Sequence, residues 1–134
     1  MITLDQYITA SGKYPERLKH KELTQDIKDN ATKLLEKINS LLKELKVEKA
    51  TVSSGWRPSD VNTKIANAAK KSLHMSGMAC DLSDPDGKLD ELIGKNDALL
   101  KKFGLWQEHP DATKSWCHLD CKDRGKRAKN VFKP

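Results

Sequence analysis

One stretch of the chain shows the apolar spacing of an amphipathic helix more clearly than any other. Between Thr24 and Lys46 the apolar residues recur every three or four positions and form one stripe, namely Ile27, Ala31, Leu34, Leu35, Ile38, Leu41, Leu42 and Leu45. Thr24 is placed to cap the first turn, where Asp26 complements the helix dipole. A coiled coil is an alternative use of this stripe, but we expect it to pack on the chain's own sheet.

Two further helices are predicted. The first covers about residues 59–71, capped by Ser59-Asp60, and directs inwards the side chains of Val61, Ile65 and Ala68 or Ala69. The second covers residues 89–103 and stops at Gly104. Before residue 24 the pattern predicts a short helix or turn and then a wrapped segment.

Four short strands are predicted, at residues 50–54, 78–83, 105–109 and 115–121. Alternate side chains of a strand share a face. Within 78–83 one face carries Ala79, Asp81 and Ser83, against Cys80 and Leu82; within 115–121 one face carries Trp116, His118 and Asp120, against Cys117, Leu119 and Cys121. If the apolar faces pack on the helices, Asp81 and His118 lie on the open side of the sheet.

These elements predict an α+β fold in which a small antiparallel sheet is backed by helices. We expect one domain over residues 1–134, with a helical part at about 1–48, a core at about 50–121 and an irregular basic tail at 122–134. A length of 134 residues with 37% hydrophobic and 33% charged residues suits a small, soluble globule. We expect it to be a monomer.

The net charge of +6 favours anionic polymers, either nucleic acid or a bacterial envelope, although a solubilising surface explains it equally well. Much of the excess lies in the tail, at Lys122, Arg124, Lys126, Arg127, Lys129 and Lys133. A nucleic-acid binder would interleave aromatic and basic residues. The tail has only Phe132, so we expect no nucleic-acid partner.

The chain lacks an apolar run of the roughly 20 residues that a membrane span needs. Residues 1–10 carry Asp5 and Gln6 and have no apolar signal-peptide core, so we expect synthesis in the cytoplasm without a leader. Free thiols are then the expected state of the three cysteines, which cannot all pair.

Candidate chemistry is concentrated in two motifs. His74, Asp81 seven residues later and His118 downstream are a sufficient ligand set for a catalytic zinc, with the fourth position left for water. Ser72 could hydrogen-bond the loop and orient His74. A structural zinc held by cysteines is the alternative, but there is no C-x-x-C pair, and adjacent Cys117 and His118 point oppositely.

The surrounding residues resemble a known family signature, SGYR … SxHxxGxAxD … WxH. The matching segments are Ser53-Ser54-Gly55-Trp56-Arg57, then Ser72-Leu73-His74 with Gly77, Ala79 and Asp81, then Trp116-Cys117-His118. The signature is that of the zinc D-Ala-D-Ala carboxypeptidase and L-alanyl-D-glutamate endopeptidase family, which includes VanY-type carboxypeptidases and many phage endolysins. The resemblance covers about residues 50–121.

The resemblance implies a hedgehog/D-Ala-D-Ala peptidase-like fold with Zn²⁺ held by His74, Asp81 and His118. It also implies that Arg57 lies beside the substrate carbonyl and stabilises the oxyanion. Trp116 belongs to the motif and is expected close to the ligands or the substrate.

The general base is not given by the motif. Many relatives carry an acidic residue or a histidine three residues before the last ligand, where this chain has Ser115. We therefore assign the base to Glu108, near the end of the preceding strand, with Asp111 in reserve. Asp120 shares a face with His118 and is expected to orient it or a neighbouring backbone group. His109 either assists catalysis or is a plain surface histidine.

The function implied is zinc-dependent hydrolysis of an amide bond in peptidoglycan stem peptides, by a D,D-carboxypeptidase or an L,D-endopeptidase. A phage endolysin, released to the cell wall or periplasm by a holin or carried in a virion, is a hypothesis that rests on small size, the missing leader and the resemblance. The alternative is a non-catalytic zinc-containing module that binds the cell wall or belongs to a phage structure.

Overall fold

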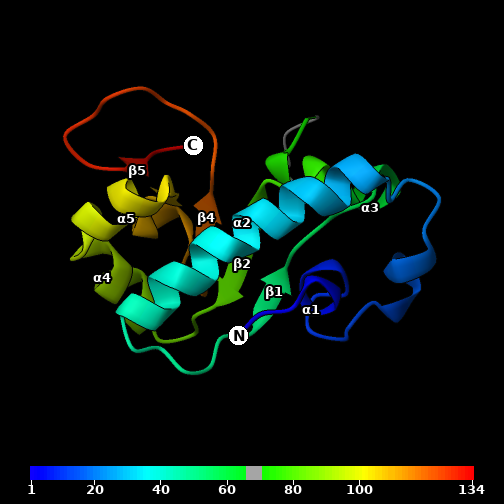
Figure 1. Ribbon diagram of the computed structural model, residues 1–134, viewed down its shortest axis with the longest axis horizontal. Coiled ribbons are helices and arrows are strands. Elements are labelled where there is room, and N and C mark those ends of the chain that lie inside the picture. Colours follow the sequence, from blue (N-terminus) through cyan, green and yellow to red (C-terminus); the bar gives the residue numbers. More distant parts are fainter. Residues whose placement is uncertain (66–70) are drawn as a thin grey trace.

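The computed structural model describes residues 1–65 and 71–134 and has the expected α+β fold (Figure 1). In these residues one sheet has the strand order β1-β2-β4-β3-β5, formed by β1 (Val52–Ser54), β2 (Ala79–Ser83), β3 (Trp106–Glu108), β4 (Trp116–Asp120) and β5 (Val131–Phe132). The pairs β1–β2, β2–β4 and β4–β3 are antiparallel, as predicted, whereas β5 runs parallel to β3. The sheet is therefore mixed.

The parallel strand lies in the tail that was expected to be irregular, so that expectation was wrong. The backbone N–H of Gln107 donates to the carbonyl of Asn130, and that of His109 donates to the carbonyl of Phe132. Two residues in a basic run carry no strand pattern of their own. The free edge of β3 supplies the pairing instead.

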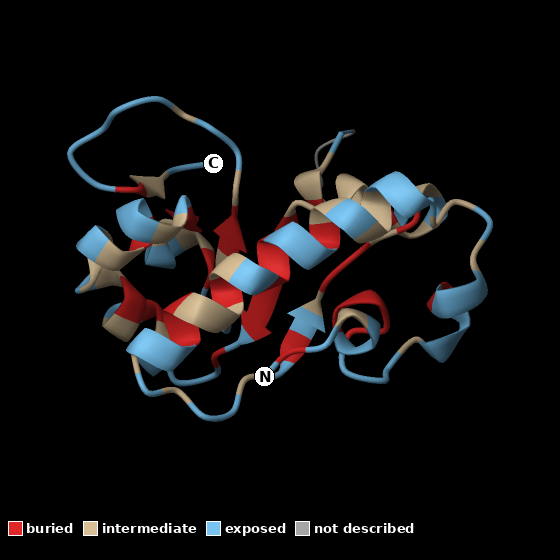
Figure 2. Cartoon of the chain, viewed as in Figure 1, coloured by how far each residue is buried: buried red, intermediate tan, exposed pale blue. Residues whose placement is uncertain are grey.

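Helix α2 (Gln25–Glu44) confirms the strongest prediction from the sequence. Its buried residues, coloured red in Figure 2, are Ala31, Leu34, Leu35, Ile38, Leu41 and Leu42. They form one hydrophobic cluster with the apolar faces of β2 and β4, which contribute Cys80, Leu82, Cys117 and Leu119. Packing of α2 on this side leaves the opposite face of the two strands for polar side chains.

The helix expected at 89–103 is divided into α4 (Lys88–Gly94) and α5 (Asp97–Phe103), so one continuous helix was wrong. Asn96 interrupts it with a backbone φ of −120°. The Asn96 side chain donates a 2.8 Å hydrogen bond to the carbonyl of Leu92, a local bond of the kind that competes with helix continuation. Gly104 ends α5 as predicted, in the left-handed region with φ 66°.

Helix α3 (Ser59–Lys64) is shorter than expected and is preceded by Pro58 at the capping position. Ile65, expected to face inwards, has 40% of its surface exposed, because the helix has already ended there. Val61 is partly buried. The predicted continuation through Ala68 and Ala69 lies outside the described residues.

The N-terminal part contains α1 (Leu4–Ile8) and a 3₁₀ turn, η1 (Pro15–Lys19). The buried hydroxyl of Tyr7 donates a 2.7 Å hydrogen bond to the carbonyl of Ala79 and so fixes α1 against the start of β2. Two further 3₁₀ turns, η2 (Leu73–Ser76) and η3 (Pro110–Ala112), lie in the loops before β2 and β4. None of the described helices combines the length and apolar character needed to cross a membrane.

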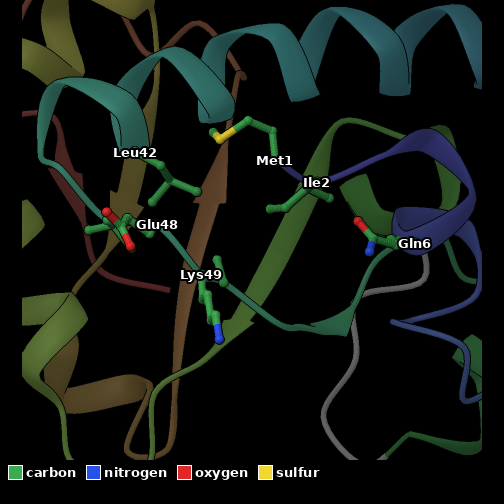
Figure 3. Close-up of a pocket in the computed structure, with 8 residues that line it drawn as sticks. Met1, Ile2, Gln6, Leu42, Glu48 and Lys49 are labelled. Atoms are coloured by element: carbon green, nitrogen blue, oxygen red, sulfur yellow. The ribbon is translucent and has the colours of Figure 1, made fainter.

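A small cavity of about 190 Å³ lies where the N-terminus meets the end of α2 and the segment after it (Figure 3). Its lining residues are Met1, Ile2, Gln6, Leu42, Val47, Glu48, Lys49 and Ala50. They include no histidine and none of the residues singled out for chemistry. This cavity is therefore no part of the candidate site.

Candidate metal centre

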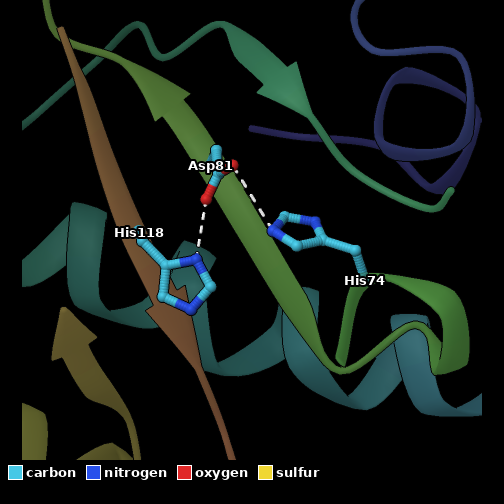
Figure 4. Close-up of side chains that lie close together, drawn as sticks. All are labelled: His74, Asp81 and His118. Carbon is cyan, nitrogen blue, oxygen red and sulfur yellow. Dashed lines mark hydrogen bonds and ion pairs between the residues drawn. The ribbon is translucent and has the colours of Figure 1, made fainter. Parts of the chain in front are cut away.

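Three side chains from two strands and a loop meet on the face of the sheet away from α2. In the β2–β4 pairing Asp81 lies directly opposite His118. His118 Nδ1 lies 2.8 Å from Asp81 Oδ1, and His74 Nε2 lies 3.4 Å from Asp81 Oδ2 (Figure 4). One ligand atom from each residue falls within 4.8 Å of the others. The two motifs of the sequence therefore form one cluster.

The loop that carries His74 is held at several points. Ser72 Oγ accepts a 3.2 Å hydrogen bond from the backbone N–H of His74. Gly77 ends the turn with φ 78°, and a Cβ on it would lie 2.7 Å from the carbonyl of Ile27 in α2. The indole N–H of Trp56 donates to the carbonyl of Met75. These contacts fix the direction of the His74 side chain.

The tautomer of His74 follows from its other ring nitrogen. His74 Nδ1 lies 2.8 Å from the carbonyl oxygen of Gly55, which can only accept. Nδ1 therefore carries a proton, and Nε2, the nitrogen that faces Asp81, is the one that can bind a metal ion after it releases its proton. Metal-binding histidines are commonly oriented in this way.

Gly55→Ala should disturb this arrangement, because a Cβ at residue 55 would collide with the backbone carbonyl of Tyr7. The Gly55 carbonyl would have to move away from His74, and zinc affinity should fall by about 10- to 100-fold. Competition with a fluorescent chelator measures this change. Gly94→Ala is the matched control, since its nearest new contact, Gln107 Oε1, would be at 3.6 Å. Equal zinc affinity in both variants would contradict the role of the Gly55 carbonyl.

His118 is held between two carboxylates. Its Nδ1 contacts Asp81, and its Nε2 lies 2.9 Å from Asp120 Oδ2. Burial alone would lower the pKa of His118, but the hydrogen bonds to Asp120 and Asp81 outweigh burial and raise the pKa to about 9. Both ring nitrogens therefore carry protons at neutral pH, and Nδ1 must release its proton before it can bind a metal ion.

Asp81 is ionised in this setting. Its burial would raise the pKa of the carboxyl, but the charge of His74 and the hydrogen bonds from His118 and His74 hold that pKa far below its usual range. A carboxylate oxygen and the nitrogens of two imidazoles are ligands that zinc accepts in proteins. The donor set therefore fits one zinc ion.

A second cluster in the described part of the chain joins His20, Glu22 and Asp60. His20 Nδ1 accepts a hydrogen bond from the backbone N–H of Glu22, so a neutral His20 carries its proton on Nε2, the nitrogen that faces the carboxylates. The His20 ring therefore presents an N–H donor to the carboxylates of Glu22 and Asp60, and not a lone pair that could bind a metal ion. Neither cluster includes a cysteine, and the thiols of Cys80 and Cys117 lie in the core.

Arg57 lies at the edge of the cluster. Its Nε donates to Ser54 Oγ at 3.2 Å, and its Nη1 donates to Asn62 Oδ1 at 3.3 Å. Its Nη2 is 3.8 Å from Asp81 Oδ2. Burial lowers the pKa of Arg57, and Asp81 opposes that effect, so the guanidinium remains a cation beside the ligands.

Glu108 flanks His118 across the β3–β4 pair. The register pairs Trp106 with Asp120 and Gln107 with Leu119, so Glu108 follows next to His118 on the polar face. The side chain is half-buried. Burial raises the pKa of Glu108, and the charges of Asp81 and Asp120 raise it further against the opposing effect of His118. A carboxylate with a raised pKa beside a metal centre is suited to proton transfer.

The other positions predicted from the sequence, Asp111, His109 and Trp116, are not among the three clustered ligand residues. Asp111 is 90% exposed and lies 3.6 Å from His109 Nδ1. His109 Nδ1 accepts the backbone N–H of Asp111 and caps η3. Trp116 is the first residue of β4, where it pairs with Ser83, and it is partly buried.

Sequence reasoning missed three groups that touch the cluster. The tail residues Arg124 and Phe132 reach it, through Asp120 and through the His118 ring respectively. The carbonyl of Gly55 also reaches it. An acidic residue two positions after His118, with an arginine four residues further on, was the only signal for Arg124.

An α+β fold that presents two imidazoles and a carboxylate on one face of its sheet is typical of metal-dependent hydrolases. The chain belongs to the peptidase M15 family, whose family model matches residues 13–120. It is therefore assigned to the metallopeptidases, and peptidases of this family are typically zinc-dependent. A search of curated proteins and of solved structures found no match. The family match takes in η1 and α2, beyond the resemblance near residues 50–121, and ends at Asp120.

Proposed function

We propose that this chain is a zinc peptidase that hydrolyses an amide bond in the stem peptides of bacterial peptidoglycan. The observation that carries the proposal is the meeting of His74, Asp81 and His118 within 4.8 Å in a chain of the M15 family. The choice of substrate rests on the resemblance of the motifs to D-Ala-D-Ala carboxypeptidases and L-alanyl-D-glutamate endopeptidases. Either of these two activities is within the proposal.

When bound by His74, Asp81 and His118, zinc supplies a Lewis acid for the substrate carbonyl and lowers the pKa of water in its open position. Glu108 takes a proton from the attacking water and returns it to the leaving amine. Its place beside His118 on the polar face and its raised pKa support this role. Arg57, fixed by Ser54 and Asn62, steadies the negative charge that develops on the carbonyl oxygen.

The remaining residues of the motifs hold these groups in place. Ser72 fixes the turn before His74, and Asp120 holds the ring of His118. Trp116, two residues from His118 along β4, borders the substrate. The net charge of +6 favours adsorption to an anionic cell wall, and added salt weakens that attraction. A monomeric phage endolysin that a holin releases to the wall fits these features.

Removal of the metal tests the proposal directly. The purified protein should release new amino groups from purified peptidoglycan, lose this activity after chelation and dialysis, and regain it with one equivalent of Zn²⁺. Mg²⁺, which prefers octahedral oxygen ligands, should not restore it. Mass spectrometry of the released fragments identifies the bond that is cut. A zinc-loaded protein that cuts neither peptidoglycan nor free stem peptides would instead be a binding or structural module.

A further inference from the structure

The last fourteen residues lie outside the family match, yet part of this segment packs against the metal ligands. The segment 121–134 leaves β4, passes through an exposed basic loop and returns as β5 beside β3. Two of its side chains turn towards the cluster. Arg124 reaches Asp120, and Phe132 reaches the ring of His118.

Arg124 binds Asp120 through both arms of its guanidinium. Nη1 donates to Oδ1 at 2.6 Å, and Nη2 donates to Oδ2 at 3.1 Å. Oδ2 is also the oxygen that faces His118 Nε2 at 2.9 Å. Because a guanidinium is planar, such a two-pronged contact fixes the plane of the carboxylate as well as its position.

This ion pair is shielded from water. The side chain of Asp120 is 1% exposed and that of Arg124 is 12% exposed. The guanidinium carbon lies 3.7 Å from the centre of the Phe132 ring, and Phe132 in turn makes an edge contact with the His118 ring at 5.8 Å. The parallel pairing of Glu108 with Phe132 keeps that aromatic ring in place.

We propose that Arg124 is a positioning residue of the metal centre and that it acts on His118 through Asp120. By fixing the plane of the Asp120 carboxylate, Arg124 keeps Asp120 Oδ2 within hydrogen-bonding distance of His118 Nε2 and so turns Nδ1 towards Asp81 and the metal position. This inference rests on the proposed zinc site but not on the proposed substrate. Segment 121–134 would then help to position a metal ligand, although the match to the family model ends at Asp120.

The first experiment compares two arginine variants of the same segment. Arg124→Met should weaken zinc binding by about 10- to 100-fold in a chelator competition assay. Arg127→Met removes an equal charge from an exposed arginine that makes no side-chain contact with Asp120, and should leave affinity within about twofold. Arg124→Lys keeps the charge but loses the planar fork, so its affinity should lie between those of wild type and Arg124→Met.

A double-mutant cycle shows whether Arg124 acts through Asp120. Asp120→Asn alone should weaken zinc binding, and adding Arg124→Met should cause little further loss, because the acceptor oxygen is already altered. Full additivity of the two losses would overturn the proposal. Wild-type zinc affinity in Arg124→Met would overturn it as well.

A readout in the metal-free protein separates positioning from zinc chemistry and from hydrolysis. The Nε2–H proton of His118 should give a slowly exchanging NMR signal in wild type and in Arg127→Met, and should exchange rapidly in Arg124→Met. If Arg124→Met fails to fold, as judged by circular dichroism, Arg124→Lys carries the test. An unchanged signal in the folded Arg124 variants would overturn the inference. Failure of wild type to cut peptidoglycan would refute the proposed function and leave these measurements valid.

Discussion

Glu108→Gln should keep zinc bound at wild-type affinity and lower kcat by about a hundredfold to ten-thousandfold. The substitution preserves the size of the side chain and removes the carboxylate that would move the proton. Glu108 is not one of the three clustered ligand residues, so the metal should stay in place. Zinc content by mass spectrometry and kcat on a stem-peptide substrate measure the two effects separately.

Asp111→Asn is the matched control for this substitution. It makes the same chemical change on a side chain that is 90% exposed and contacts His109, so kcat should stay within about twofold of wild type. An active Glu108→Gln enzyme together with an inactive Asp111→Asn enzyme would move the base to Asp111. Activity in both variants would leave His109 as the remaining candidate for the general base.

His74→Ala should abolish both zinc binding and hydrolysis. Loss of a ligand is more severe than loss of a group that orients one, so zinc affinity should fall by more than about 100-fold. The buried carboxylate of Asp81 would also lose one of its two imidazole partners. Isothermal titration with Zn²⁺ measures the affinity, and thermal unfolding of the metal-free protein shows whether the fold survives.

His109→Ala removes another imidazole of the chain and provides the comparison for His74→Ala. His109 caps η3 and is outside the clustered ligands, so its loss should leave zinc affinity unchanged. A His74→Ala protein that binds zinc as tightly as wild type would remove the basis for the proposed centre. A large loss of affinity in His109→Ala would extend the ligand set beyond the three residues.

The alternation of side chains along the strands correctly predicted the positions of the two ligand residues that lie in the sheet. Asp81 and His118 were expected on the open faces of two strands, and the antiparallel register pairs them directly. Their apolar neighbours Cys80 and Leu119 lie in the core as expected. The period of two along a strand is a local property, so sequence alone can reveal it.

The position of His74 could not be predicted from periodicity. It lies in a 3₁₀ turn that is capped by Ser72 and Gly77 and is also held by the side chain of Trp56, which comes from a distant part of the chain. The residue types suggested His74 as a zinc ligand with Asp81 and His118, and the resemblance of the motif strengthened that hypothesis. The role of Arg124 was missed for a related reason, since its tail had been interpreted only as a source of positive charge.

The predicted helix boundaries were wrong where a local polar interaction outweighed the hydrophobic spacing. The apolar spacing from residue 89 to 103 continues past Asn96, whose side chain nevertheless bonds the backbone and divides the helix. Strand β5 shows the opposite case, in which pairing with a distant strand orders residues that have no pattern.

Strand β5 comes late in the sequence, so it limits when the candidate centre can form during synthesis of the chain. Translation produces His74 and Asp81 well before Phe132, and Phe132 and Arg124 must both be present before His118 is fully restrained. A nascent chain on the ribosome therefore has an unfinished centre, however well its earlier helices have folded. The proposed zinc site is therefore expected to reach its full affinity only once residue 132 has emerged and paired with Glu108.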